Sequence, residues 1–249
     1  MRTEIQIAVL EIEELINQEA TPQTLFGTQF SDRKESTNKH ILLVHGWNSD
    51  SAAMGKIYQE LKKAPEATNY TFWRVDYDWT RAFPFGSSQV KESLIENNIP
   101  LDRTIIFCYS MGGVVMRKVL SEGLPFYALV SVCSPNQGML LFKDEGSLSL
   151  QYNSQDLYNL NHNAKDKLNR SKFSFYGISH TNPAGYHSGD SIVDLSSAMG
   201  KDLYPNRSGE MNVKYPSAHN PFEPHSLGME PKFIILALDR CKELMTKLV

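Results

Sequence analysis

The sequence predicts an α/β protein with one mainly parallel β-sheet and helices on both of its faces. Between residues 40 and 133, short apolar β-branched runs alternate with amphipathic stretches, at the spacing of repeated strand–helix units. The run Ile105-Ile106-Phe107 lacks polar alternation, as expected of a central strand buried on both sides. A chain of 249 residues, 41% hydrophobic and 21% charged, suits one such domain with a substantial core.

Each element of this fold follows from local periodicity. Apolar side chains that recur on one face, such as Ile57 and Leu61, predict helices, and β-branched or aromatic runs predict strands. Pro231 suits the first turn of the last helix. In chain order we expect strands at 40–44, 70–79, 104–109, 126–133, 173–179 and 211–215, and helices at 52–63, 87–97, 111–122 and 231–248.

Two segments fall outside this alternation. Residues 1–39 precede the domain of residues 40–249 and are expected to be an N-terminal helical and connecting segment. Residues 135–170 are polar and interrupt the domain. Because long loops inside compact domains are usually functional, and because residues 139–142 are apolar, we expect a lid-like insertion here; the alternative is a plain surface excursion.

Composition excludes several classes of partner. A net charge of −3 gives no broad basic surface, so we expect no nucleic-acid partner. The longest apolar run near the N-terminus, Ile7 to Leu10, is too short for a signal peptide or a membrane span. Three widely spaced cysteines form neither a disulfide framework nor a zinc motif. We therefore expect a cytoplasmic, reduced protein with no stable membrane insertion; its oligomeric state is not predicted.

Ser110 lies where a buried strand meets a helix, in Cys108-Tyr109-Ser110-Met111-Gly112-Gly113. A serine hydroxyl is a weak nucleophile unless a base lies beside it, and a sharp strand-to-helix turn lifts it out of the sheet. Such a turn needs small residues two positions away, which Gly112 and Cys108 provide. The alternative is that Ser110 only caps the helix.

The stretch His45-Gly46-Trp47 ends the first strand of the domain. A tetrahedral acyl intermediate needs two N–H donors for its oxyanion, and we expect the backbone amides of Trp47 and Met111 to supply them. His45 is expected to hold this loop in place rather than to act as a base.

An acid and a base follow later in the chain, in the order that this type of site requires. Asp190 lies in Gly189-Asp190-Ser191-Ile192-Val193 and is the expected acid; a simple turn residue is the alternative, with Asp194 the next candidate. The base lies before the last helix, as His225 or His219. His162, His180 and His187 are expected to be solvated and are not at metal-ligand spacing.

The chain resembles the lipase and esterase branch of the α/β hydrolases, near the lipase-like and GPI-inositol-deacylase-like domains. The resemblance covers residues 40–248 and is carried by Leu42 to Trp47, Tyr109 to Gly113, Cys133 to Gly138, Gly189 to Val193 and His225-Ser226-Leu227. It implies that Ser110 is the nucleophile, that Asp190 is the acid and that Trp47 and Met111 are the oxyanion donors. Cys108 departs from the family's usual glycine, and Asp194 stands where proline often follows the acid.

The same resemblance favours His225 over His219. In these lipases the histidine precedes the last helix by a short loop and is followed closely by an aliphatic residue, as Leu227 follows His225. Pro221 and Pro224 also stiffen the approach to His225. His219 stays the alternative base.

The expected reaction is hydrolysis of a small-molecule ester or lipid-like substrate through an acyl-enzyme, with no metal and no organic cofactor. Two alternatives share the fold: acyl transfer to an alcohol or thiol, and a non-catalytic binding protein. The acyl length and the alcohol of the substrate are not predicted.

Overall fold

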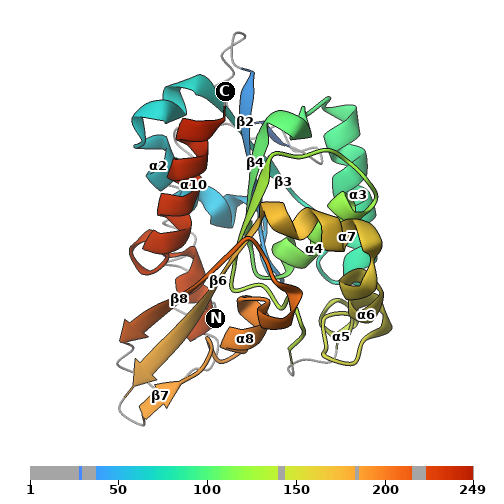
Figure 1. The fold of residues 1–249 in the computed structure, drawn as a ribbon, viewed down its shortest axis with the longest axis vertical. Coiled ribbons are helices and arrows are strands. Elements are labelled where there is room, and N and C mark those ends of the chain that lie inside the picture. The colour runs from blue at the N-terminus through green and yellow to red at the C-terminus, as the bar shows by residue number, and fades with distance from the viewer. Residues whose placement is uncertain (1–27, 30–37, 140–143, 183–184, 215–222, 249) are drawn as a thin grey trace, which may run out of the picture.

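The predicted fold class is confirmed by the computed structural model, in which an eight-stranded, mainly parallel sheet separates two layers of helices (Figure 1). The structure describes residues 28–29, 38–139, 144–182, 185–214 and 223–248. Within these ranges, no helix has both the length and the apolar character that crossing a bilayer requires. The predicted segment 1–39 lies outside the described residues, apart from residues 28–29 and 38–39.

The sheet has the strand order β1-β3-β2-β4-β5-β6-β7, with β8 paired to β6. The short end strands β1 and β7 are antiparallel to their neighbours, and the other pairs are parallel. The strands are β1 Thr28–Gln29, β2 Lys39–Val44, β3 Tyr70–Val75, β4 Thr104–Tyr109, β5 Ala128–Val132, β6 Phe173–Asn182, β7 Gly185–His187 and β8 Arg207–Lys214.

Helices cover both faces of the sheet. On one side lie α2 (Gly55–Lys62) and α10 (Ile235–Lys247), and on the other lie α3 (Phe83–Glu96), α4 (Met111–Ser121) and α7 (Ala164–Asn169) (Figure 1). The other α-helices of the described residues are α5 Glu145–Leu148, α6 Gln155–His162, α8 Leu195–Ala198 and α9 Glu223–Ser226.

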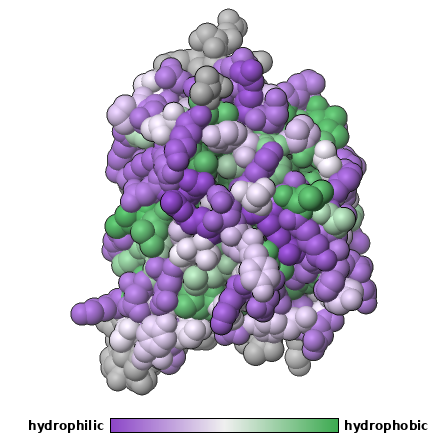
Figure 2. All heavy atoms as spheres, viewed as in Figure 1, coloured by the Kyte–Doolittle hydropathy of each residue, from purple (hydrophilic) through white to green (hydrophobic). Residues whose placement is uncertain are grey.

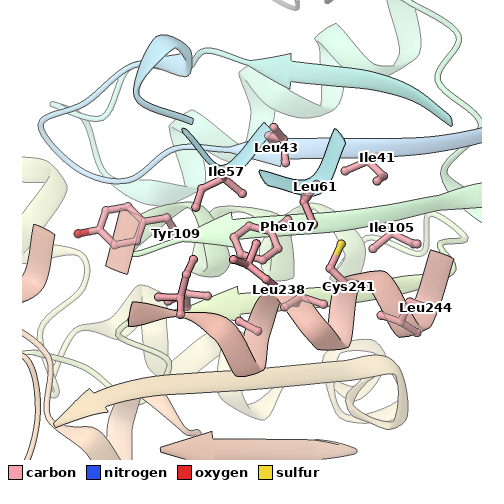
Figure 3. Close-up of a cluster of buried hydrophobic side chains, with 14 of the residues drawn as sticks. Ile41, Leu43, Ile57, Leu61, Ile105, Phe107, Tyr109, Leu238, Cys241 and Leu244 are labelled. Carbon is pink, nitrogen blue, oxygen red and sulfur yellow. The ribbon is translucent and has the colours of Figure 1, made fainter. Parts of the chain in front are cut away.

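Successive residues of the central strands point to opposite faces of the sheet and pack into two separate hydrophobic cores. Ile41, Leu43 and Phe107 pack against α2 and α10, and Figure 3 shows Leu238 and Cys241 of α10 facing them. Leu42 and the alternate residues of β4 pack on the opposite side, against α3 and α4. Because both faces are buried, the strands need no polar alternation, which explains the apolar runs in the sequence.

Several predicted boundaries are corrected. The strand predicted at 70–79 ends at Val75, because a turn follows in which Asp78 accepts hydrogen bonds from the backbone N–H and the hydroxyl of Thr80. The helix predicted at 87–97 begins four residues earlier, at Phe83, with Pro84 in its first turn. The last strand begins at Arg207, earlier than the predicted 211. Its first residues are mostly exposed and polar, so a search for apolar runs does not detect them.

The described part of the predicted lid insertion, residues 135–170, contains three α-helices (α5, α6 and α7) that local patterning did not reveal. Residues 140–143, most of its apolar cluster, lie outside the described residues, so its function as a lid stays a prediction. The later part is joined to the body by a fully buried ion pair: Arg117 of α4 donates to both oxygens of Asp166, at 3.1 and 2.9 Å. Arg170 donates to the same carboxylate.

Asp166→Ala should destabilise the protein strongly, because it leaves the buried Arg117 guanidinium without its carboxylate. We expect a loss of about 3–5 kcal/mol in the free energy of unfolding, measured by urea denaturation. As a control, Lys91→Ala removes the partly exposed ion pair with Glu122, and we expect it to cost no more than about 1 kcal/mol. Equal effects of the two substitutions would contradict this account of the ion pair.

Candidate active site

Ser110 occupies a strained turn between β4 and α4. Its φ is 50° and its ψ is −128°, a conformation that residues with a side chain rarely adopt. The Ser110 N–H donates to the carbonyl of Val132 in the neighbouring strand, at 2.8 Å. The helix begins at the next residue, so the serine hydroxyl lies at the carboxyl edge of the sheet beside a helix N-terminus.

Two glycines allow the chain to approach closely around this turn. A Cβ atom at Gly112 would lie 2.3 Å from the carbonyl oxygen of His45, and one at Gly46 would lie 2.8 Å from the Cβ of Ser110. Cys108, which departs from the glycine of the motif that the sequence resembles, is fully buried in the core on the α3–α4 side of the sheet. The turn at Ser110 therefore accommodates a thiol at position 108.

His225 bridges Ser110 and Asp190. Its Nδ1 lies 2.8 Å from Oδ2 of Asp190, and its Nε2 lies 2.9 Å from Oγ of Ser110. Because a carboxylate only accepts, Nδ1 carries the proton, and Nε2 accepts a hydrogen bond from the serine hydroxyl. All three side chains are largely shielded, with Ser110 6% exposed and the His225 side chain 12% exposed. This arrangement can move a proton away from the serine hydroxyl.

Asp190 is fixed by its own turn. Its Oδ1 accepts the backbone N–H groups of Ile192 and Val193, at 3.1 and 2.8 Å, which leaves Oδ2 for the imidazole. The turn is further held by His180, whose Nδ1 bonds to the Gly189 carbonyl at 2.9 Å. His180 is only 3% exposed, so its predicted solvation is wrong: its imidazole packs against that of His187, at 4.5 Å between ring centroids.

The short helix α9, which carries His225, is held by the strand that precedes Ser110. The Tyr109 hydroxyl donates to the backbone carbonyl of His225 at 2.8 Å, and the two rings pack at 5.1 Å. His219, the alternative base, lies outside the described residues. The structure thus brings His225 to Ser110 and gives no position for His219.

The predicted oxyanion donors flank the serine. Met111 is the first residue of α4, and Trp47 follows Gly46, which packs against Ser110. The Trp47 indole donates to Asp144 at 3.1 Å, which joins this loop to the start of α5. That the two backbone amides bind an oxyanion stays a prediction.

His45 lies beneath this loop. Its Nδ1 bonds to the Gly46 carbonyl at 2.8 Å, and its ring stacks on Tyr77, whose hydroxyl donates to the His45 carbonyl. Burial lowers the pKa of His45, so its imidazole is neutral near pH 7 and cannot donate through both nitrogens.

The described residues contain one group of three side chains with metal-binding atoms close together, Cys133, Asp190 and His225, whose atoms lie within 4.8 Å of one another. A metal would need the thiolate form of Cys133, but burial and then the Asp190 charge raise the pKa of this thiol well above its usual value. Asp190 and His225 are already paired with each other. This donor set therefore does not fit a resident metal.

A cavity of about 440 Å³ lies beside the Asp190 turn. It is lined by His180, Tyr186, Ser191 and Asp194, among others, but not by Ser110 or His225. It is therefore separate from the reacting atoms.

Comparison with solved structures shows the α/β-hydrolase fold. Bacillus licheniformis lipase BlEst2 in its mature form is 15% identical, covers 90% of this chain and 99% of its own, and superposes with a TM-score of 0.60. A hormone-sensitive lipase from a metagenome library is 17% identical over 96% of this chain and 90% of its own (TM-score 0.52). The RedJ thioesterase of Streptomyces coelicolor is 10% identical over 84% and 87% (TM-score 0.53). No family model and no curated protein sequence matches the chain.

The two candidate bases can be separated by substitution. His225→Ala should lower the kcat for an activated ester by several orders of magnitude, on the order of 10⁶ for loss of the base in a comparable triad, because Ser110 loses the acceptor of its proton. His219→Ala serves as the matched histidine-to-alanine control and should retain near-normal turnover. A dead His219 variant beside an active His225 variant would reverse the assignment.

Proposed function

We propose that the chain is a serine hydrolase that cleaves carboxylic esters with Ser110, His225 and Asp190. The observation that carries the proposal is the continuous hydrogen-bonded series from Ser110 Oγ through His225 to Asp190, with distances of 2.9 and 2.8 Å. These are the distances that a nucleophile, its base and an orienting acid require. The two lipases among the structural neighbours support the same class of reaction.

In the first half-reaction, Ser110 Oγ bonds to the ester carbonyl carbon while its proton passes to His225 Nε2. The carbonyl π electrons move to oxygen and form an oxyanion. The amides of Trp47 and Met111 donate to that oxygen, and the N-terminus of α4 favours its negative charge.

Asp190 holds Nδ1 protonated and stabilises the imidazolium that forms on His225. The ester C–O bond then breaks, and His225 gives its proton to the departing alkoxide, which leaves an acyl group on Ser110. In the second half-reaction, water loses a proton to His225 and attacks the acyl carbon. The same histidine returns a proton to Ser110 Oγ, and the carboxylic acid is released.

The proposed substrate is a small-molecule ester in a reducing, cytoplasmic setting. The three cysteines, Cys108, Cys133 and Cys241, are buried and unpaired, which fits such a compartment. On the face in Figure 2, hydrophobic side chains form separate patches among hydrophilic ones, a surface that favours dissolved substrates over an oil interface.

Ser110→Ala should abolish hydrolysis of a p-nitrophenyl ester, with a loss on the order of 10⁶ in kcat, because it removes the hydroxyl that takes the acyl group. Steady-state kinetics measure the loss, and circular dichroism checks that the variant is folded. The assignment is wrong if a folded variant keeps more than about a tenth of the wild-type activity, because an enzyme that has lost its nucleophile cannot retain that much.

Acyl-chain preference tests the proposed substrate class. We expect kcat/KM to be higher for p-nitrophenyl esters of short or medium acids than for long ones, and emulsified long-chain triglyceride to be a poor substrate. The Ser110→Ala variant gives the background rate for each ester. Strong activation by the triglyceride emulsion would contradict this preference.

A further inference from the structure

Cys133 occupies a constrained position directly after β5. Its φ is 53°, in the left-handed region, and its side chain is fully buried. Its backbone N–H donates to the carbonyl of Tyr176 in β6, at 2.8 Å. The backbone therefore fixes the direction of the side chain, and the mechanism proposed above does not use it.

The thiol lies against the Asp190–His225 pair. The Sγ of Cys133, a carboxylate oxygen of Asp190 and a ring nitrogen of His225 all lie within 4.8 Å of one another. The Asp190 carboxylate is also one of the groups that raise the pKa of this thiol. Since burial and the Asp190 charge raise the pKa of Cys133, the sulfur keeps its proton. The S–H group is then the donor and the carboxylate the acceptor.

This donor differs from the others that reach Asp190. The amides of Ile192 and Val193 belong to the aspartate's own turn, and His225 is the group that must change its protonation during the reaction. Cys133 comes from the end of a central strand. It therefore links the acid to the rigid sheet through a contact that persists in both protonation states of His225.

We propose that Cys133 is a positioning residue for the triad acid: its thiol donates to the Asp190 carboxylate and holds it at the imidazole. The inference rests on the proposed function. It predicts that removal of the Cys133 thiol changes the charge balance of the site as well as its packing.

The sign of this effect follows from the hydrogen bond. A carboxylate that loses one donor carries more uncompensated negative charge and holds a protonated imidazole more strongly. Because the protonated base is inactive, the acidic limb of the kcat/KM profile should then move to higher pH. Among the described residues, the titratable side chains at Asp190 are Cys133, Tyr109 of β4 and His225 of α9, and His180 of β6 bonds to the adjacent Gly189 carbonyl. Burial raises the pKa of Tyr109 well above its usual value, so Tyr109 stays neutral across this range.

The test compares three substitutions at Cys133 with one matched control. Cys133→Ala removes the donor, and Cys133→Gly removes it with a residue that suits a positive φ, in case the alanine variant does not fold. Cys133→Ser keeps a donor. Cys241→Ala is the control, because Cys241 is another fully buried thiol in the same core, contributed by α10. The readouts are kcat, KM and the pH profile of kcat/KM for a soluble p-nitrophenyl ester.

We expect the alanine or glycine variant to lose about tenfold in kcat with KM within about twofold, the scale of one weak hydrogen bond to a charged group. Its acidic limb should move up by about half a pH unit. The serine variant should restore the limb to its wild-type position, and Cys241→Ala should match wild type.

Two results would overturn the inference. One is a donor-free variant with the wild-type limb, whatever its kcat, since loss of packing alone leaves the charge balance unchanged. The other is a serine variant that shifts the limb as far as alanine does. A wild-type protein with no hydrolysis would instead refute the proposed function, and the inference with it.

Discussion

The positive φ of Ser110 is the constraint on which the candidate site depends. The turn exists because the Ser110 N–H bonds to Val132 in the next strand and because Gly112 lies almost against the backbone of His45. A relaxed backbone at this position would move the hydroxyl away from His225 Nε2, which lies only 2.9 Å away. The strain is maintained by the packed sheet on one side and the buried helix α4 on the other.

The parallel sheet brings distant parts of the chain to this turn. Ser110 follows β4, Asp190 lies on the turn after the β6–β7 hairpin, and His225 lies between β8 and α10. The carboxyl ends of parallel strands meet at one edge, where functional sites of open α/β sheets usually form. The buried Arg117–Asp166 pair stabilises the same region, because Arg117 belongs to the helix that begins beside Ser110.

Local sequence patterns were sufficient for the fold class and for Ser110. The strand-to-helix turn at Ser110 is specified within a few positions by a strand, a small residue, a serine and a glycine. Ser110 can therefore be recognised directly from the sequence. The choice of His225 needed family resemblance, because His219 satisfies the same local criteria. The contacts of Arg117 with Asp166, of His180 with Gly189 and of Cys133 with Asp190 join residues far apart in sequence. No periodicity encodes such pairs, so the sequence does not reveal that His180 is buried. The helices of residues 145–169 are also not evident from local patterning.

The central claim is that Ser110 is an activated nucleophile, and its covalent modification tests this most directly. The wild-type protein and Ser110→Ala are treated with a fluorophosphonate, digested, and analysed by mass spectrometry. We expect Ser110 Oγ of the wild-type protein to attack the probe's phosphorus and displace fluoride, so that Ser110 carries the phosphonyl group, while the variant remains unlabelled. A wild-type protein without adduct, or with equal labelling in the variant, would contradict it.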